Sequence, residues 1–380
     1  MKILLVGEYS RLHNSLKEGL VTLGHDVLLV GTADGFKNFN VDINYEATFF
    51  TRPSINWLVK AILKLTTINL IKLEYAYRFN KILKSLKGFD VVQLINQNSI
   101  KTHPFIEKRL LNKLISQNKK TFLLACGTDY VSVQYALDKK FKYSILTPYF
   151  NNADLKKYYN HILKKTSSAN QKLFAFLQNN TNGIISSDLD YHLPYNNKKG
   201  YLGMIPNPII INNNDLTPTK NESKIVIFHG INTSNYIKKG NDIFDKALDT
   251  ISKKYPDTVD VVRTENVPYT DYITSYNSCH ILMDQIYAYD QGYNALEAMS
   301  KGKVVFTGAE KEWLDYYNLE EDTVAIHALP SVDYLVEKLD WLINNPDQIE
   351  RISKHAIAFI KTHHHYKKIA KQYLDTWNKA

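Results

Sequence analysis

The chain has 380 residues, of which 44% are hydrophobic and 22% charged, and its formal net charge is +9. This length suffices for two domains of ordinary size, and the composition is that of a globular protein without low-complexity tracts. With only two cysteines, the chain has no disulfide framework. It contains no uninterrupted run of about 18 apolar residues, so we expect no membrane span. The apolar run at the start is too short for a signal peptide, so we expect a cytoplasmic protein.

The first half of the chain alternates short apolar runs with helical periodicity, which is typical of a parallel sheet covered by helices. The expected strands are 2–7, 26–31, 90–95, 121–126, 183–187 and 201–205. The expected helices are 12–23, 105–114 and much of 130–177. Pro206-Asn207-Pro208 then breaks the chain before a polar stretch at 212–218, which indicates a domain boundary nearby.

Polar residues join the first expected strand to the first helix. Arg11, His13 and Asn14 stand at the helix start, where a phosphate or an acceptor molecule could bind. For His13 a merely solvated loop histidine is the alternative. No G-x-G-x-x-G fingerprint is present, which argues against NAD.

The stretch from Arg52 to Lys87 carries eight basic residues and a single acidic one, Glu74. One face of its first helical segment is apolar and comprises Trp57, Leu58, Ala61, Ile62, Leu65 and Ile68. Such a helix could lie in a membrane interface, with Lys60 and Lys64 held by anionic lipid. The alternative is a helix packed on the sheet with its lysines in water. No base-reading motif is present, so we expect no nucleic-acid partner.

This basic stretch belongs to a wider charge asymmetry. Residues 1–205 hold 28 Lys and Arg against 14 Asp and Glu, whereas the remainder holds 19 against 24. A basic surface favours phosphate-rich partners such as an anionic bilayer or a phosphorylated substrate.

Polar side chains also follow the next two strands. Asn98 and His103 come after 90–95 and could line the acceptor side of a site. Asp129 follows 121–126, where it could orient a reacting hydroxyl or cap the next helix.

The second half restarts the alternation of strand and helix. The expected strands are 224–229, 259–263, 280–283, 304–307 and 324–326, and the expected helices are 241–254, 293–301, 332–343, 347–362 and 366–379. Three consecutive histidines at 363–365 point in different directions on a helix, so we expect no metal site and a solvated hinge there.

A phosphate-binding arrangement is indicated early in this second half. The first strand is followed by Gly230, and a loop then brings Lys239 next to Gly240 at a helix start. Backbone N–H groups and a cation converge at such a point, as a diphosphate requires. A solvated lysine pair is the plain alternative.

The most informative segment runs from Tyr289 to Gly308. Gly292 and Tyr293 begin a short helix that is followed by an apolar strand. Glu297 could accept hydrogen bonds from a sugar diol, while N–H groups of the first helical turn face an anion. An ordinary helix–strand unit with a surface glutamate is the alternative.

The run from Leu296 to Val305, LEAMSKGKVV, resembles the LEAMA-x-G-x-PVV signature of retaining GT-B glycosyltransferases of the family 4 group and its relatives. The resemblance implies an α/β fold with two Rossmann-like domains facing a cleft, and a C-terminal helix crossing back to the N-terminal domain. We therefore expect an acceptor-binding domain at 1–208, a nucleotide-sugar donor domain at 209–362 and the crossing helix at 363–380.

The resemblance also implies residue roles. Glu297 would bind the ribose hydroxyls and Lys239 the donor diphosphate, while Asp129 would lie nearest the reacting centre. Tyr289 stands where the family has the first glutamate of its E-x7-E pattern. The family's arginine after the glycine is absent: Asn232 stands near its position, and Arg263 is a possible substitute. The predicted donor-binding residues are Gly230, Asn232, Arg263, Asp290, Gln291, Gly292, Tyr293, Asn294 and Glu297. The predicted catalytic residues are His13, Asp129 and Lys239, and the predicted acceptor-side residues are Arg11, Asn14, Asn98 and His103.

The implied activity is transfer of a sugar, with retention, from a nucleotide donor to a glycan or lipid-linked acceptor in surface-polysaccharide synthesis of the bacterial type. We expect a UDP-sugar as co-substrate, no other cofactor, and peripheral contact with the inner face of the plasma membrane. Two alternatives stay open: a non-hydrolysing nucleotide-sugar epimerase, and a catalytically silent GT-B protein that binds a glycan or a partner.

Overall fold

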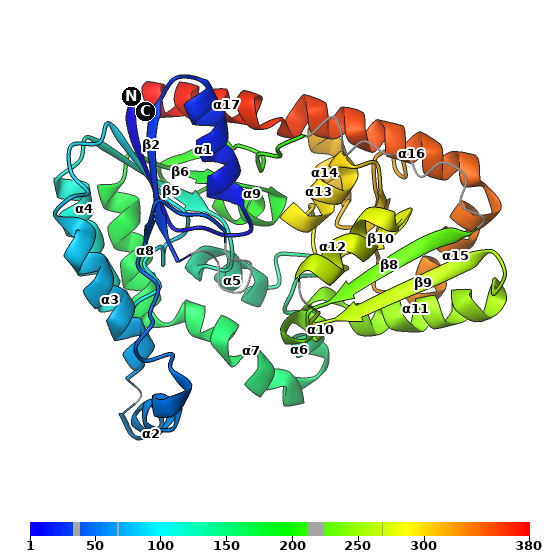
Figure 1. Cartoon of the computed structure of the whole chain (residues 1–380), viewed down its shortest axis with the longest axis horizontal. Coiled ribbons are helices and arrows are strands. Elements are labelled where there is room, and N and C mark those ends of the chain that lie inside the picture. Colours follow the sequence, from blue (N-terminus) through cyan, green and yellow to red (C-terminus); the bar gives the residue numbers. More distant parts are fainter. Residues whose placement is uncertain (33–38, 67, 212–223, 268) are drawn as a thin grey trace. The chain divides into compact units, whose positions relative to one another are not determined.

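The computed structural model describes residues 1–32, 39–66, 68–211, 224–267 and 269–380. It divides the chain into two compact units, each containing one parallel sheet (Figure 1). Unit 1 comprises Met1–Gln134, His161–Pro208 and Tyr366–Ala380, and unit 2 comprises Tyr135–Asn160 and Ile209–His365. The polar stretch expected at 212–218 lies outside the described residues.

The sheet of unit 1 has seven strands in the order β3-β2-β1-β4-β5-β6-β7, and every pair is parallel. The strands are β1 (Lys2–Val6), β2 (Asp26–Gly31), β3 (Ile43–Asn44), β4 (Val91–Leu94), β5 (Lys120–Ala125), β6 (Gly183–Ser186) and β7 (Tyr201–Met204). Six of them were predicted; β3 has only two residues, too few to produce an apolar pattern. Continuous apolar runs are expected because a parallel sheet is covered on both faces.

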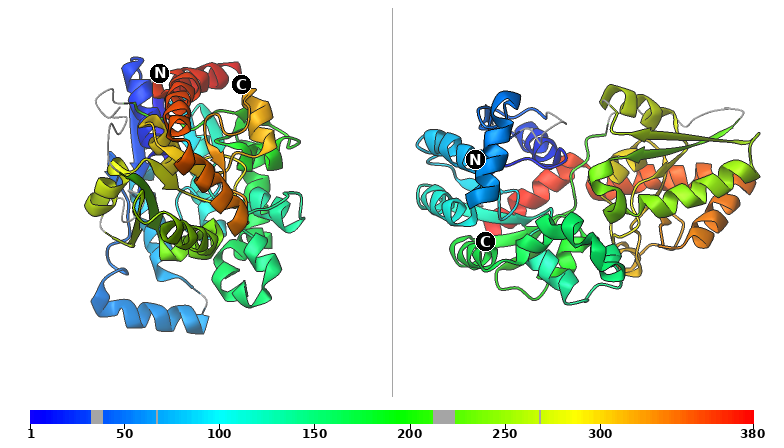
Figure 2. Two further views of the ribbon diagram at one scale, coloured as in Figure 1. Left: turned by 90° about the vertical axis from the view of Figure 1, so that its right-hand side faces the viewer. Right: turned by 90° about the horizontal axis from the view of Figure 1, so that it is seen from below.

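Helices surround this sheet, and the last one returns to the first. They are α1 (Leu12–Thr22), α2 (Asn56–Thr66), α3 (Leu70–Leu83), α4 (Pro104–Ser116), α5 (Tyr130–Leu137), α8 (Ser168–Asn180), α9 (Leu189–Tyr195) and α17 (Tyr366–Lys379). Helix α17 packs along α1 (Figures 1 and 2), where a Cβ on Gly19 would lie 2.6 Å from the carbonyl oxygen of Tyr366. Trp377 of α17 is fully buried, and Lys120 Nζ donates to its carbonyl oxygen at 2.9 Å. The C-terminal crossing predicted from the sequence is thus confirmed.

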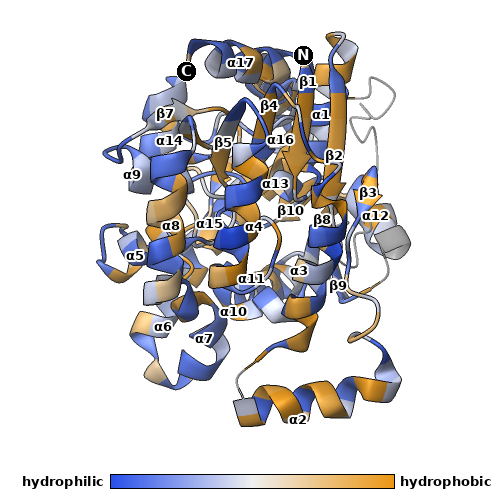
Figure 3. Cartoon of the chain, turned by 90° about the vertical axis from the view of Figure 1, so that its left-hand side faces the viewer, coloured by the Kyte–Doolittle hydropathy of each residue, from blue (hydrophilic) through white to orange (hydrophobic). Residues whose placement is uncertain are grey.

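Helix α2 behaves differently from the other helices of unit 1. It projects from the body of the unit (Figures 1 and 3), and Val59 is its only buried residue. Trp57 is 70% exposed and Leu65 is 83% exposed. The alternative in which this helix packs its apolar face on the sheet is therefore wrong.

The sheet of unit 2 has five parallel strands in the order β12-β11-β10-β8-β9. The strands are β8 (Ile225–Ile231), β9 (Val259–Glu265), β10 (Ile281–Met283), β11 (Val304–Thr307) and β12 (Ile326–His327). The helices after β8 are α10 (Tyr236–Lys239), α11 (Asn241–Lys254), α12 (Tyr269–Ser278), α13 (Tyr293–Ser300), α14 (Lys311–Tyr317), α15 (Val332–Asn344) and α16 (Pro346–Phe359). Helices α11 and α15 pack together (Figure 2), and Phe244, Leu248, Leu335 and Leu339 join the core of the unit.

A segment early in the chain also belongs to unit 2. Residues 135–160, expected within the first domain, include α6 (Thr147–Asn151) and the start of α7 (Lys156–Leu163). Its anchor is Tyr289, whose ring lies 5.1 Å from that of Phe141 and whose hydroxyl accepts the N–H of Lys142 at 2.7 Å. Glu310 adds an ion pair with Lys142 at 2.8 Å and a hydrogen bond from Tyr143 at 2.6 Å. Because these contacts join residues far apart in the sequence, no local sequence pattern predicts that residues 135–160 belong to unit 2.

This anchor predicts an acid-sensitive contribution to stability. Burial alone would raise the pKa of Glu310, but hydrogen bonds from Lys142, Tyr143 and the N–H of Lys311 lower it to about 2. A depressed carboxyl pKa stabilises the folded state above the ordinary pKa of 4.5, and the stabilisation is lost as the pH falls from there toward 2. We expect Glu310→Gln to lower the free energy of unfolding by about 1–3 kcal/mol at pH 7 and by less at pH 3.

Urea unfolding of the wild type and the variant at both pH values measures this difference. Glu320→Gln, at an exposed position in the same unit, is the matched control and should change nothing. An equal loss for Glu310→Gln at pH 3 and pH 7 would contradict the ionic role of this carboxylate.

The histidine run after α16 corrects another expectation. Residues Ile360–His364 form a π-helical segment, and His364 is buried, with its ring 5.3 Å from that of Phe359. Its carbonyl oxygen accepts the N–H of Ile209 at 2.7 Å. The run is therefore packed at its centre and is not the solvated hinge expected from the sequence.

Candidate functional site

The strand order of unit 2 defines where a ligand is expected to bind. From β8 the chain proceeds to β9 on one side, and β10 then pairs with β8 on its other side. Open α/β sheets bind ligands at such a switch point, outside the carboxyl ends of the strands. Helix α10, which ends at Lys239, follows β8, and Asp284 follows β10, so both residues come to this edge.

Four side chains, Lys239, Asp284, Asn294 and Thr307, form a polar group at this edge, which we call the Lys239 cluster. Lys239 Nζ lies 3.0 Å from Asp284 Oδ1, to which Asn294 Nδ2 also donates at 3.2 Å. Thr307 Oγ1 donates to Asp284 Oδ2 at 3.3 Å. The Asp284 side chain is 1% exposed and that of Lys239 is 34% exposed. The carboxylate therefore holds the ammonium group, which remains accessible to a ligand.

The backbone around Lys239 is held just as closely. Its carbonyl oxygen accepts the N–H of Ile286 at 2.9 Å. The next residue, Gly240, has φ 74°, and a Cβ there would lie 2.8 Å from the side chain of Ile286. Only glycine satisfies both conditions. The tight turn at Gly240 begins α11 directly after Lys239, so the N–H groups of the first turn of α11 follow Lys239 in the chain.

Glu297 and Gly230 are linked to the Lys239 cluster through two tyrosines of α12. Tyr272 Oη donates to Asn294 Oδ1 at 2.8 Å, and Tyr276 Oη donates to the carbonyl oxygen of Asn294 at 2.9 Å. Burial raises the pKa of both tyrosines, and the half-buried Glu297 carboxylate raises it further. A Cβ on Gly230 would lie 2.4 Å from the Tyr272 ring. Gly230 thus leaves room for that ring.

Other predicted donor-binding residues have local structural partners. Asp290 and Gln291 are buried: the Asp290 carboxylate accepts the N–H of Gln291 at 2.6 Å, and Gln291 Nε2 donates to Gly308 at 2.6 Å. Asn232 accepts the N–H of Ser234 at 3.0 Å within its own turn. In the loop that contains Asp290 and Gln291, Tyr293 is 9% exposed and Gly292 is the N-cap of α13. Asp290, Gln291, Gly292 and Tyr293 thus shape the loop that leads into α13.

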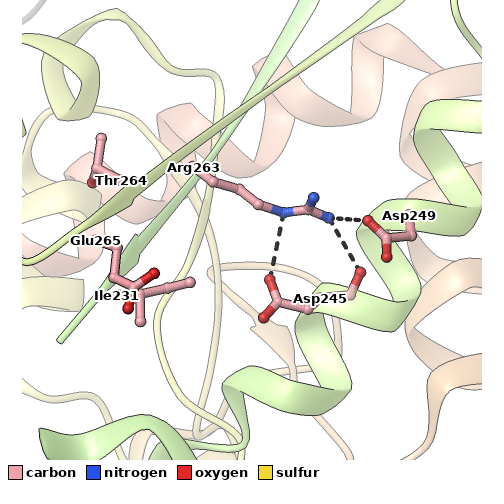
Figure 4. Close-up of a pocket in the computed structure, with 6 residues that line it drawn as sticks. All are labelled: Ile231, Asp245, Asp249, Arg263, Thr264 and Glu265. Atoms are coloured by element: carbon pink, nitrogen blue, oxygen red, sulfur yellow. Dashed lines mark hydrogen bonds and ion pairs between the residues drawn. The ribbon is translucent and has the colours of Figure 1, made fainter. Parts of the chain in front are cut away.

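Arg263 lies in a separate pocket of about 440 Å³ (Figure 4). Its guanidinium group pairs with Asp249 Oδ1 at 2.7 Å and with Asp245 Oδ1 at 3.4 Å, both on α11. Ile231, Thr264 and Glu265 complete the lining. Two carboxylates already satisfy Arg263, so the geometry does not favour the donor role expected from the sequence.

Unit 1 has its own switch point, between β1 and β4. His13 follows β1 but is fully enclosed, and its Nδ1–H donates to the carbonyl oxygen of Gly7 at 2.7 Å. Burial lowers the pKa of His13 to about 3, so the ring is neutral near pH 7. His13 was predicted to be catalytic, but it lies in the core, because helix α1 directs this side chain inward.

The neighbouring predicted residues lie nearer the surface. Arg11 is half-buried and has φ 72° as the N-cap of α1. Asn14 donates its backbone N–H and its side-chain Nδ2 to Glu8 Oε2, each at 2.8 Å. Glu8 is a fully buried carboxylate that the sequence reasoning missed. Its position two residues after the end of β1 is the sequence signal that could have indicated it.

Asp129 shows the helix-capping geometry that the sequence left open. Its carboxylate accepts the N–H of Ser132 at 2.8 Å and the hydroxyl of Tyr195 at 2.6 Å, and it is 1% exposed. Burial raises the pKa of Asp129, and the hydrogen bonds from Tyr195 and Ser132 partly oppose this rise. After β4, Asn98 accepts a hydrogen bond from Lys165 Nζ at 3.4 Å, and His103 is the N-cap of α4. Lys165 was not among the residues predicted from the sequence, whereas Asp284, at the end of a strand, was expected either to face the site or to fix its loop.

Two possible features are not found in the described part of the chain. No group of three or more His, Cys, Asp or Glu side chains there is arranged to hold a metal ion. No described helix is long and apolar enough to cross a membrane.

The two Rossmann-like units and the returning C-terminal helix define the GT-B fold, and solved structures confirm it. HepE from Anabaena, in complex with UDP and glucose, matches over all of both chains with 14% identity and a TM-score of 0.61. Sucrose-phosphate synthase from Thermosynechococcus elongatus has 12% identity and a TM-score of 0.60, with 100% of this chain and 99% of that chain covered. TarM from S. aureus, in complex with UDP among other ligands, has 13% identity and a TM-score of 0.55 over 82% of this chain and 59% of that one.

Sequence comparison adds a family match for the second half. The model of a family described as glycosyl transferase-like matches residues 236–375, which include Lys239, Asp284 and Glu297. No curated protein matches the sequence.

Proposed function

We propose that the protein is a glycosyltransferase that takes a sugar from a nucleotide donor held by unit 2. The observation that carries this proposal is the Lys239 cluster, where a partly exposed lysine side chain is held by a buried aspartate at the switch point of the sheet, directly before the turn that begins α11. The family match over 236–375 and the UDP bound by HepE support it.

The residues then have distinct roles in the reaction. Lys239 and the first-turn N–H groups of α11 stabilise the charge that develops on the leaving diphosphate. Asp284 positions Lys239, and Glu297 accepts hydrogen bonds from the ribose hydroxyls. The resemblance of the LEAM segment to retaining enzymes extends the proposal to retention of anomeric configuration, which proton NMR of the first product formed would measure.

Nucleotide binding tests the donor site directly. Calorimetric titration should show that a nucleoside diphosphate, with UDP as the expected one, binds the wild type. Binding to Glu297→Gln should be about tenfold weaker or more, because an anionic acceptor of two ribose hydroxyls is lost. Glu320→Gln, at an exposed site in the same unit, is the control. If no nucleoside diphosphate binds the wild type, the donor-site assignment is wrong.

The acceptor is proposed to be a glycan or a lipid-linked sugar carrier that binds unit 1. The exposed apolar side chains of α2, next to the lysines of the 52–87 stretch, support contact with the inner, anionic face of the plasma membrane. Both features fit a role in surface-polysaccharide synthesis. Epimerisation of a nucleotide sugar without any acceptor would instead favour the epimerase alternative.

A further inference from the structure

Unit 1 holds a group of charged side chains that the donor site does not use. Its members are Lys72 on α3, Glu107 on α4, Asp129 after β5, and Lys165 in the 3-10 turn Lys164–Thr166 before α8. Residues of the loop between β4 and α4 connect them: the Thr102 hydroxyl donates to the carbonyl oxygen of Lys72 at 2.7 Å, and the Thr102 N–H donates to Glu107 at 3.0 Å. Lys165 Nζ donates to Asn98 of the same loop at 3.4 Å, and the effects of Asp129, Lys72 and Glu107 on the pKa of Lys165 agree with this proximity. We call these four residues the Lys165 group.

Neither carboxylate of the Lys165 group needs a lysine as its partner. Glu107 is fully buried and accepts the N–H groups of Ile100 at 2.7 Å and of Thr102 at 3.0 Å. Asp129 is satisfied by Ser132 and Tyr195. Burial raises the pKa of Glu107 to about 7, so the two carboxyl groups balance only part of the charge of the two lysines. Their oxygens already accept hydrogen bonds from other groups.

Lys165 is left with few partners. In the part of the chain that the structure describes, its Nζ has one hydrogen bond, a long one of 3.4 Å to Asn98 Oδ1. An ammonium group has three N–H donors, so most of its capacity is unused. Burial lowers the pKa of Lys165, Lys72 lowers it as well, and Asp129 and Glu107 oppose this effect. Two neighbouring cations with spare donors favour an anionic ligand.

Hydrogen bonds from neighbouring amide side chains fix the turn that carries Lys165. Asn170 Nδ2 donates to the carbonyl oxygen of Lys164 at 3.0 Å, which holds the turn. Gln97, from the loop after β4, donates to Asn170 Oδ1 at 3.4 Å and accepts the N–H of Tyr130 at 3.3 Å. An amide network therefore ties this turn to the loops after β4 and β5, the strand edge where a ligand of unit 1 is expected.

We propose that Lys165 and Lys72 bind a phosphate group carried by the acceptor. The proposal rests on the proposed function only in calling this ligand an acceptor. A phosphate fits better than a carboxylate because it carries more charge and presents several oxygens, which two separate ammonium groups can share. The excess of 28 basic over 14 acidic residues in 1–205 attracts the same kind of ligand.

Calorimetric titration of inorganic pyrophosphate into the protein tests the proposal, with UDP present in excess so that it occupies the Lys239 cluster. We expect pyrophosphate to bind the wild type and to bind Lys165→Met at least about tenfold more weakly, because a charge-assisted contact is lost. Lys164→Met removes an exposed lysine from the same turn and is the matched control, with binding unchanged. UDP affinity should be the same in all three proteins.

Other outcomes are equally decisive. Equal pyrophosphate binding by Lys165→Met and the wild type overturns the proposal, as does binding of glucuronate, a carboxylate probe, without pyrophosphate. If Lys165→Met fails to fold, Lys72→Met takes its place and must also weaken pyrophosphate binding. If UDP fails to bind the wild type while pyrophosphate still depends on Lys165, the proposed function fails and the phosphate site stands.

Discussion

Replacing Lys239 with alanine is expected to lower the rate of sugar transfer about 10- to 1000-fold, the range found when a group that stabilises developing negative charge is removed. The Lys239 side chain is one-third exposed and its ammonium group is held by Asp284 at 3.0 Å, so the group is already oriented when the donor binds. Such preorganisation costs no rearrangement during the reaction. The effect should therefore fall mainly on kcat, which steady-state kinetics with a radiolabelled donor would measure.

Two further variants separate catalysis from folding. Lys238→Ala removes the adjacent lysine, whose Nζ lies 5.7 Å from the centroid of the Tyr158 ring, and should retain most activity. Lys239→Ala also leaves the buried Asp284 carboxylate without its cation, which destabilises the protein. The double variant Lys239→Met with Asp284→Asn removes both charges and should restore stability without restoring turnover. Wild-type turnover in Lys239→Ala would show that this lysine does not stabilise the leaving group.

Reversing four exposed charges is expected to abolish binding to anionic vesicles. The variant combines Lys60→Glu, Lys64→Glu, Lys81→Glu and Lys84→Glu, all at exposed positions on α2 or at the end of α3. Each lysine near an anionic bilayer contributes about 1 kcal/mol, so losing four attractions lowers the partition coefficient roughly a thousandfold. Flotation with vesicles that contain phosphatidylglycerol measures this, and neutral vesicles serve as the reference.

Trp57 provides an internal reporter for the same surface. It is 70% exposed, whereas Trp313 and Trp377 are buried, so insertion of α2 should shift its emission to shorter wavelength. Trp57→Phe removes the shift while leaving flotation largely intact. If the charge-reversed variant floats with anionic vesicles as the wild type does, the proposed membrane contact is wrong. The exposed apolar side chains of α2 would then bind a different partner.

The elements of both units could be predicted because their signals are local. The helices expected at 241–254 and 366–379 agree with α11 and α17 at both ends. The periodic spacing of apolar side chains and a glycine at a turn can both be recognised within a few neighbouring residues of the sequence. Gly230, Lys239 and Glu297 could be predicted as candidate donor-site residues for the same reason, since each belongs to a short motif at a strand end or helix start.

The roles of other candidates depended on contacts that no local pattern records. Asp284 meets Lys239 across 45 residues, and Lys142 meets Glu310 across 168. Tyr289 occupies the place of a sugar-contacting glutamate in the resembling family, yet its hydroxyl and ring hold residues 135–160. Sequence position alone does not distinguish a ligand contact from such an anchor.

The sequence by itself determined two α/β units, a lysine beside a glycine at a helix start, and an amphipathic basic helix, because backbone hydrogen bonding and periodic burial act over short distances along the chain. Only the tertiary structure decided that His13 is enclosed, that Asp129 caps a helix and that Lys165 has one long hydrogen bond among the residues that the structure describes. Those outcomes follow from which distant side chains meet and which are excluded from water.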